Sequence, residues 1–440
     1  MLPLTLDRQK NYPKEDFKLI DLSFAERVIY WSIVLTPVWW LLGIQTLFYP
    51  AVVIGLLVIS FDFDKLVRTS LPTSAWAWLA MAIVMLWTAM IGINNVGFEF
   101  TTVAANLVTF FKGYFLIFAC LVIPFGDRLR VKVITRAVAW MAVGYLVTVV
   151  LQLIMIFLGI EIPPFFPPIA YLIPGNKSLI VWLNAFFNPF FGIPLPRSML
   201  YMPDPPIPGI CGLLCFFICL GETNPRLRKF ALAGSLAALL ISHSRLAWVC
   251  LPFGILVYVS FRSFFARQAS MWLFSITALL SSLLGITLTA LVNIPLEIFH
   301  NARPSSSKDR EFVIQKTMEA WQQSPWIGWG IPQETADWYT YEVTLGSFST
   351  YTGVLYLHGI IGLIFFLAAL GFTLSNFWQP AVEGNSMAKK AFATLLALYV
   401  FIQGLPLSWI AVYIWFFFLW LGAILAEIEK NKYSYSFQNR

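Results

Sequence analysis

The sequence predicts an all-α integral membrane protein that crosses the membrane with about 12 helices. Of its 440 residues, 59% are hydrophobic and 12% are charged, whereas soluble domains carry about 25% charged residues. Apolar runs long enough to cross roughly 30 Å of hydrocarbon recur along the whole chain. Of the 29 lysines and arginines, 21 fall on one side of these runs if both termini are cytoplasmic. This distribution is the one that the positive-inside rule requires.

The predicted elements begin with a polar segment, residues 1–27, that lacks the apolar core and cleavage site of a signal peptide. We expect it to be a cytoplasmic tail, with a second cytoplasmic tail at 427–440. Nine predicted spans lie within 28–293 and three within 350–426. Their bounds are 28–43, 44–61, 75–93, 103–124, 134–159, 205–221, 229–242, 246–261, 271–293, 350–376, 390–404 and 408–426.

Two segments on the predicted outer side are long. Residues 160–204 are too apolar for a disordered linker and too interrupted by proline for a regular span. We expect them to lie in the membrane interface or to re-enter the bundle. Residues 294–349 form the large outer loop, where SKDREFVIQKTMEAWQQ predicts an amphipathic helix on the outer face. Its expected N-cap is Ser306 or Ser307, and its expected stop is Pro325. Its apolar residues at near-helical spacing are Phe312, Ile314, Met318 and Trp321.

The sequence contains no motif for a metal, a cofactor or a nucleic acid. The five cysteines lie in apolar runs, without a CxxC pair or histidines at metal-ligand spacing, so we interpret them as small buried side chains. The phosphate-binding loop, the HExxH motif and the GxSxG elbow are missing from the chain. The net charge of +7 follows from the inner-side bias and needs no nucleic-acid partner. We therefore expect chemistry that uses neither a metal nor a cofactor.

Basic residues that break the inner-side bias are the first candidates for function. The outer arginines are Arg197, Arg245, Arg303 and Arg310. A guanidinium pairs bidentately with phosphate oxygens, so several of them at an outer interface suit a lipid-linked diphosphate. Each could instead extend to lipid headgroups or pair with a local carboxylate. Lys112 lies inside a predicted span and should face the bundle interior, either as added charge for the same site or in a buried ion pair.

Histidines and aromatic residues on the outer side are weaker candidates. His243, His300 and His358 all fall on that side, and a histidine is a natural general base, although a single buried histidine is more often a packing residue. The tryptophans and tyrosines of the large outer loop form either an interfacial belt or flat platforms for sugar rings. Trp329 is our candidate for the second role.

These features, in this order, resemble the O-antigen ligase and polymerase family of bacterial membrane glycosyltransferases. The resemblance covers about residues 180–370 and is carried by PRSMLYMPDPPIPGICGLL, SHSRLAWV, KDREFVIQKTMEAWQQSPWIGWGIP and LGSFSTYTGVLYLHGIIGL. It implies a multi-pass protein of the bacterial plasma (inner) membrane that transfers a glycan from an undecaprenyl diphosphate carrier on the outer face. Arg197 and Arg245 match the family arginines that hold the diphosphate, where they would neutralise the leaving group.

The predicted site and reaction also involve further residues and partners. The expected substrate-binding residues are Arg310, Arg303, Lys112, His243, Ser349, Tyr351 and Trp329. The expected partners are an undecaprenyl-diphosphate-linked oligosaccharide, membrane lipid, a flippase and a chain-length regulator. No metal or cofactor is implied.

One position departs from the family pattern. Family ligases typically carry a histidine just before the hydroxyl pair, read as activating the acceptor hydroxyl, where this chain has Phe348. Three explanations stay open: a different base, departure of the diphosphate that makes a base unnecessary, or loss of catalysis. Our catalytic candidate for the base is Glu342, and the alternatives are Asp337, Glu319, His243, His300 and His358.

Because that histidine is tied to ligation, we expect a polymerase that joins lipid-linked repeat units into O-antigen or exopolysaccharide. A ligase that transfers the glycan to a lipid A core is the alternative within the family. A lipid-linked glycan flippase or another transporter is the alternative from a different class. Transporters often show two related halves, which the sequence does not show.

Overall fold

The computed structural model describes residues 21–61, 69–127, 129–167, 169, 180–261, 263–269, 272, 275–276, 304–333, 335–338 and 341–438. The described part of the chain is mostly helical, with two short β-hairpins. Its elements are α1 (Phe24–Val34), α2 (Thr36–Leu42), α3 (Gln45–Ser60), α5 (Thr73–Val96), α6 (Phe100–Lys112), α7 (Tyr114–Asp127), α8 (Val131–Phe157), β1 (Phe186–Phe190), β2 (Ile193–Arg197), α9 (Pro206–Cys219), α10 (Pro225–Ile241), α11 (Arg245–Ser260), α14 (Pro304–Trp321), β3 (Thr335–Trp338), β4 (Tyr341–Thr344), α15 (Thr350–Val382), α16 (Ser386–Phe401), α17 (Leu407–Ile410) and α18 (Trp415–Gln438).

Long apolar helices bear out the prediction of an α-helical membrane protein. Among the described residues, four helical stretches are long and apolar enough to cross a membrane: Thr73–Asn95, Phe100–Asp127, Val131–Phe157 and Thr350–Val382. Each overlaps a predicted span. The total of about 12 spans and the cytoplasmic location of both termini stay predictions, and almost all of the predicted span at 271–293 lies outside the described residues.

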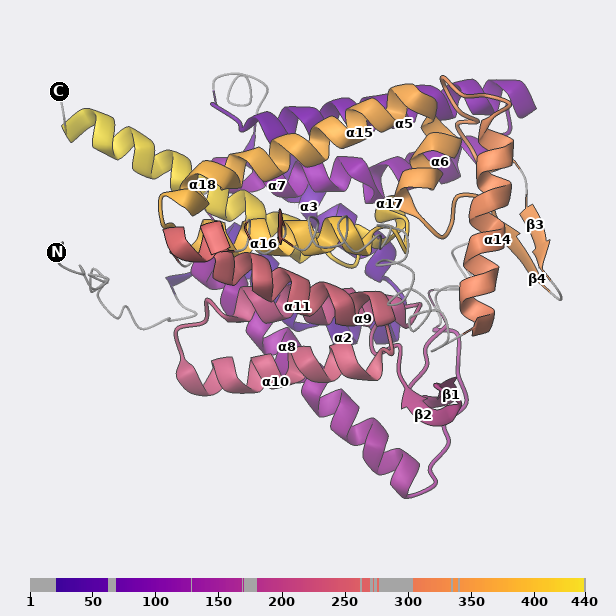
Figure 1. Ribbon diagram of the computed structural model, residues 1–440, viewed down its shortest axis with the longest axis horizontal. Helices are drawn as coiled ribbons and strands as arrows, with labels where there is room; N and C mark the ends of the chain where they lie inside the picture. Colours follow the sequence, from indigo (N-terminus) through magenta and orange to yellow (C-terminus); the bar gives the residue numbers. More distant parts are fainter. Residues whose placement is uncertain are drawn as a thin grey trace.

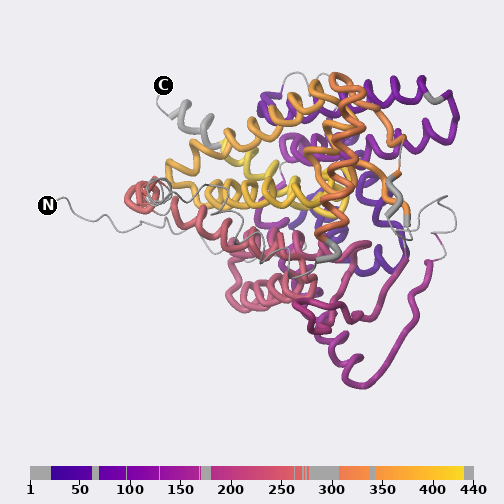
Figure 2. Tube along the Cα trace, turned by 45° about the vertical axis from the view of Figure 1, so that its right-hand side comes forward, coloured from indigo at the N-terminus to yellow at the C-terminus, as the bar shows by residue number. Residues whose placement is uncertain are grey.

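The long helices run roughly along one direction, and α14 stands across their ends (Figure 1). A second view shows the C-terminal end of α8 projecting away from the other helices (Figure 2). α10 packs on α8 and α9, α15 packs on α5 and α16, and α18 packs on α7. The end of the bundle that α14 covers is therefore distinct from the end at which α18 leaves the bundle.

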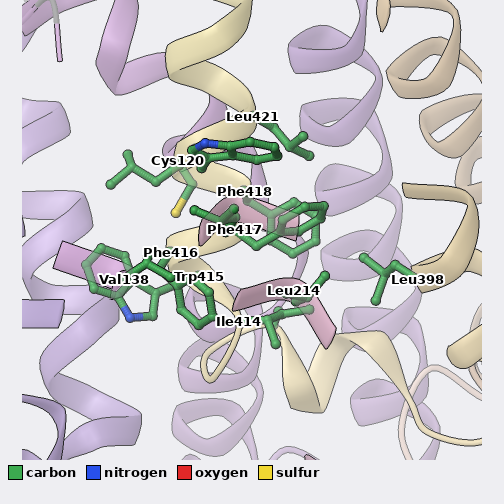
Figure 3. Close-up of a cluster of buried hydrophobic side chains, with 14 of the residues drawn as sticks. Cys120, Val138, Leu214, Leu398, Ile414, Trp415, Phe416, Phe417, Phe418 and Leu421 are labelled. Atoms are coloured by element: carbon green, nitrogen blue, oxygen red, sulfur yellow. The ribbon is translucent and has the colours of Figure 1, made fainter. Parts of the chain in front are cut away.

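The core is centred on the first half of α18. All residues from Trp415 to Leu425 except the glycine are buried apolar side chains, and Cys120, Val138 and Leu398 from other helices surround them (Figure 3). All five cysteines are buried and reduced, as the sequence predicted. A helix that is apolar on every side belongs in the interior of a bundle rather than at its surface.

The α18 helix begins later than predicted. The span predicted at 408–426 contains instead the four-residue helix α17, a turn, and only then α18. The segment between α16 and α18 is held by Thr350, whose Oγ1 donates to the carbonyl of Leu405 at 2.6 Å and accepts from the amide of Leu407 at 2.8 Å. These bonds satisfy backbone groups in an irregular segment, which is a requirement for non-helical chain inside a membrane protein.

The hairpin β1–β2 was not predicted. Its antiparallel register pairs Phe186 with Arg197 and Phe190 with Ile193, and its two-residue turn, Phe191–Gly192, has φ angles of 49° and 75°. Positive φ at both turn residues matches the twist of a tight hairpin. The hairpin lies within the segment 160–204 that we expected at the membrane interface, and the exposed side chains of Phe187, Phe191 and Ile193 suit that environment.

Two ion pairs hold the opposite end of α8, away from this hairpin. The guanidinium of Arg136 donates to both carboxylate oxygens of Glu222, at 2.8 and 2.7 Å. Arg130 pairs in the same way with Glu26, at 2.7 Å for each bond. Burial raises the pKa of Glu26, but the hydrogen bonds from Arg130 outweigh burial and bring it below its ordinary value.

Stability that depends on Glu26 should fall in acid. A carboxyl with a lowered pKa stabilises the fold above its unfolded-state pKa and loses that contribution as the pH falls through its folded-state pKa. We expect Glu26→Gln to cost about 1 kcal/mol at neutral pH, because Arg130 is half exposed and solvent weakens the pair. The check is the thermal unfolding midpoint in detergent from about pH 7 down to about pH 4. The difference between wild type and variant should shrink as the pH falls; a difference independent of pH would contradict the assignment.

Candidate functional site

The α14 helix forms the wall of the candidate site. It begins at Pro304, two residues before the first serine that we predicted as its N-cap, because proline is well suited to the first helical position. Its buried face holds Val313, Thr317 and Ala320, which lie at helical spacing. The predicted apolar residues flank this face and are only partly buried. The hairpin β3–β4 lies on the side of α14 away from the bundle (Figure 1).

A break in α15 joins this wall to the bundle. Gly359 has φ 61° and ψ −164°, which interrupts the helix and releases its backbone hydrogen-bonding groups. Residues 325–331, which we name the insertion loop, bond to these groups: the amides of Trp329 and Gly330 donate to Tyr356 and Leu357 at 2.9 and 2.7 Å. In return, the amides of Ile360 and Ile361 donate to the carbonyls of Pro325 and Trp326, at 2.9 and 3.2 Å. The break therefore leaves none of these four amides unpaired.

The glycines of this region are required by close approach of backbones. A Cβ atom on Gly330, where φ is 71°, would lie 2.0 Å from the carbonyl oxygen of Thr88. A Cβ on Gly359 would lie 2.2 Å from the carbonyl oxygen of Trp326. Only glycine fits where two backbones meet at such distances and φ is positive. The glycine motifs that suggested the family therefore build the scaffold of the site.

His358 is part of that scaffold. It is 3% exposed, and its Nδ1 lies 2.6 Å from Oγ1 of Thr88 in α5. The sequence left two roles open for this histidine, packing and catalysis. A buried ring with a hydrogen-bond partner corresponds to the packing role. The hydrogen bond ties α15 to α5 directly next to the break.

Arg197 is the first of three arginines that meet at the α14 end of the bundle. It ends β2, is 9% exposed, and donates from Nε to the carbonyl oxygen of Ser242 at 2.9 Å. Ser242 begins the turn between α10 and α11, in which His243 has φ 49°. Gly209 of α9 packs against this turn, and a Cβ there would lie 2.8 Å from Oγ of Ser242. The turn is thus held from two sides.

Arg245 follows this turn as the first residue of α11. Its Nη1 donates to Oγ of Ser307 in the first turn of α14 at 3.2 Å. The N-terminus of a helix favours anions, because its free amides and the helix dipole are both positive there. Arg245 adds a full charge at that place.

Arg310 lies one helical turn after Ser307, on the same side of α14. Its Nη1 donates to the carbonyl oxygen of Gly404 at 2.8 Å, and its guanidinium carbon lies 5.3 Å from the centre of the Phe348 ring. Burial lowers the pKa of the Arg310 guanidinium, and the carboxylates of Asp204 and Asp309 oppose that effect. An arginine nonetheless stays charged in a protein.

These contacts connect Arg197, Arg245 and Arg310, which we name the outer arginine cluster. Arg197 bonds to Ser242, and Arg245 follows three residues later and bonds to Ser307. Arg310 then follows Ser307 by one turn. Three of the four predicted outer arginines are thereby brought to one place, and Arg303 lies outside the described residues. The cluster brings guanidinium groups to the α14 end of the bundle, where the carboxylates of Asp204 and Asp309 act on Arg310.

Other predicted site residues are held mainly by the scaffold. Trp329 donates from Nε1 to the carbonyl of Ala320 at 2.9 Å, and Tyr351 donates its hydroxyl hydrogen to the carbonyl of Tyr399 at 2.9 Å. Ser349 is the buried N-cap residue of α15. His243 is buried next to the cluster, with its ring 5.4 Å from that of Phe190. Their substrate contacts stay predictions.

Two predicted residues lie apart from these contacts. Lys112 ends α6 at the break before α7, beside Gly113, which packs on Ser408 near α17. Glu342 is exposed on β4, opposite Asp337 in the register of the outward hairpin. Its role as a base stays a prediction, and His300, one of its alternatives, lies outside the described residues. Glu319 is exposed and pairs with Lys316 at 2.7 Å on α14.

The sequence did not predict the contact of Phe348 with Arg310 or the contribution of Gly404. In the sequence, Phe348 was notable only because its side chain cannot accept a proton. Gly404 ended the span predicted at 390–404, and Pro406 fell in the short connection before the span predicted at 408–426. The sequence Gly-Leu-Pro is a turn signal there.

Comparison with known proteins identifies the segment that carries most of this site. Residues 230–367, about a third of the chain, match the family model described as O-antigen ligase. The match includes Arg245, Arg310, Phe348 and the insertion loop, whereas Arg197 precedes it. No curated protein matches the chain. The match supports ligase- or polymerase-type processing of a membrane glycan, and with the apolar helices it indicates a membrane protein. Residues 230–367 are thus similar to the family described as O-antigen ligase, in agreement with the resemblance that the sequence motifs indicated.

Proposed function

We propose that this protein is a glycan polymerase that joins undecaprenyl-diphosphate-linked repeat units on the outer face of the bacterial plasma membrane. The outer arginine cluster is the observation that carries the proposal. Arg197, Arg245 and Arg310 come from three separate elements and meet at one end of the bundle. A diphosphate on a membrane lipid is the ligand whose charge and depth suit such a cluster.

The proposed reaction exchanges one bond at the first sugar of the donor. The bond from its anomeric carbon to the diphosphate oxygen breaks, and the acceptor hydroxyl oxygen forms a new glycosidic bond to the same carbon. Undecaprenyl diphosphate departs with the bonding electrons, and the hydroxyl proton passes to water. The arginines stabilise the charge that develops on the diphosphate oxygen, an electrostatic contribution that commonly amounts to several kcal/mol.

Phe348 favours a polymerase over a ligase. Its side chain offers no proton acceptor at the position where the ligase reading requires one, and its ring faces Arg310 instead. The acceptor in a polymerase is a second lipid-linked repeat unit. The O-antigen ligase description of the matched family keeps the lipid A core as the second candidate acceptor.

The test is an assay of the purified protein in liposomes with an authentic lipid-linked repeat unit. We expect the wild type to make a ladder of longer glycans, and Arg197→Ala and Arg245→Ala to lower kcat/KM about 100-fold or more. Arg226→Ala is the matched control, because Arg226 is exposed at the opposite end of α10 and should leave the rate unchanged.

Each other outcome identifies an alternative. Transfer only when a lipid A core is supplied would replace the polymerase by a ligase. Movement of the intact donor across the bilayer without any transfer would place the protein among the transporters. A ladder that both arginine variants still make at the wild-type rate would remove the cluster from the mechanism.

A further inference from the structure

Phe348 contacts Arg310, the member of the outer arginine cluster that lies on α14. We propose that Phe348 is a positioning residue, whose ring holds the guanidinium of Arg310 so that its free N–H groups point to the donor diphosphate. The proposal rests on the proposed function and names a residue through which that site is built. The carbon of the guanidinium lies 5.3 Å from the ring centre, within the range of a cation–π interaction.

Arg310 makes two contacts, one through Nη1 with Gly404 and one through the face of its guanidinium with Phe348. A guanidinium has five N–H groups. Among the described residues, Arg310 donates one hydrogen bond, from Nη1 to Gly404, and no carboxylate lies within ion-pair distance of it. Its remaining N–H groups have no hydrogen-bond acceptor among the described residues, and the carboxylates of Asp204 and Asp309 act on the guanidinium from beyond ion-pair distance. A phosphate takes such groups in pairs, which a planar fork offers and an ammonium does not.

The two groups that hold Arg310 belong to one frame. Thr350, two residues after Phe348, is hydrogen-bonded to the segment that contains Gly404. Its amide donates to the carbonyl of Ile402 at 2.9 Å, and its Oγ1 donates to the carbonyl of Leu405 at 2.6 Å. The ring and the carbonyl that position the guanidinium therefore move together. A shift of α14 relative to this frame would displace the arginine from both.

The ring of Phe348 is itself held by packing. It lies against a small buried cluster between α14 and α15. The members of this cluster are Val313, Ala320, Leu345 and Tyr356. The ring cannot leave the guanidinium without opening this packing, so the preferred geometry of Arg310 is set before a donor arrives. Preorganised donors of this kind contribute most to stabilising developing charge.

The experiment separates ring electrostatics from packing. Phenylalanines with one to four ring fluorines are placed at position 348 of the full-length protein in liposomes. Fluorine withdraws charge from the ring face while nearly preserving its shape, so it weakens a cation–π contact stepwise. The readouts are the affinity for added undecaprenyl diphosphate and the KM and kcat for the lipid-linked donor.

We expect donor KM and the dissociation constant of undecaprenyl diphosphate to rise steadily with the number of fluorines, by about tenfold at four. Phe348→Tyr should keep the wild-type values, because it keeps the aromatic ring. Phe348→Leu should resemble the protein with four ring fluorines at position 348. The same series in Arg310→Gln should be flat. Fluorination of Phe312, which packs on the same cluster, is the matched control and should have no effect.

The outcomes are distinguishable. Binding of undecaprenyl diphosphate with no dependence on fluorination at position 348 would overturn the positioning role and leave the proposed function intact. A dependence that persists in Arg310→Gln would assign the ring to packing. A wild type that neither binds undecaprenyl diphosphate nor transfers the glycan would overturn both.

Discussion

Arg310→Lys is expected to lower the kcat/KM of glycan transfer about 100-fold, although it keeps the positive charge. An ammonium can replace the single bond to Gly404, but it has no planar fork for the two oxygens of a phosphate and no flat face for the ring of Phe348. The loss should appear in both KM and kcat, because the fork binds the donor diphosphate and the contact strengthens as charge develops on the departing group.

Measurement of kcat and KM in liposomes with a lipid-linked donor checks this expectation, with two controls. Lys316→Arg changes a basic residue on the exposed side of α14 and should leave both parameters unchanged. Arg310→Gln should fall at least as far as Arg310→Lys. Full activity in Arg310→Lys would mean that position 310 supplies charge alone, and the fork would have no part in the site.

Gly330→Ala is expected to destabilise the protein by about 3 kcal/mol or more, the range of large backbone and packing defects. The added Cβ would lie 2.0 Å from the carbonyl oxygen of Thr88, and φ at this position is 71°. Because the atoms nearest to the added Cβ belong to the backbone, they cannot move aside by rotation of a side chain. The insertion loop should detach from the break in α15, which would leave buried amides unpaired and would release α14 with its arginine.

The thermal unfolding midpoint in detergent and limited proteolysis of the 304–349 segment measure this effect. Gly371→Ala is the matched control, since Gly371 lies in α15 with nothing within 4 Å of an added Cβ. Alanine should be neutral or slightly stabilising there, because it favours a helix interior over glycine. Equal midpoints for the two variants would show that the insertion loop tolerates a shift and is not the tie between α14 and α15.

Much of the fold could be predicted where a single segment decides its own structure. The long spans at 75–93, 134–159 and 350–376 correspond to α5, α8 and α15, because a long apolar run has few alternatives to a membrane helix. The α14 helix was predicted from its own caps and periodicity, although its start was misplaced. These features depend on residues within a few turns of one another.

Prediction failed where distant segments decide the structure. The break at Gly359 lies inside an apolar run that reads as one continuous helix, and it exists because the insertion loop supplies replacement hydrogen bonds. The β1–β2 hairpin was hidden by prolines within its strands, which are tolerated only in a two-stranded sheet with free edges. Neither feature has a periodicity of its own.

The candidate site divides in the same way. Arg197, Arg245 and Arg310 were recognisable because a charge on the outer side opposes a strong compositional bias, so each residue carries its own signal. The sequence by itself therefore predicted a helical membrane protein, its similarity to the O-antigen ligase family, and the arginines that we propose bind an anion. The role that we propose for Phe348 depends on the tertiary structure, because α14 places the guanidinium of Arg310 over its ring. The carbonyl of Gly404, 94 residues from Arg310 in the sequence, accepts a hydrogen bond from the same guanidinium. A cation–π contact and a single hydrogen bond depend on distances of a few ångströms, which packing sets and composition does not encode.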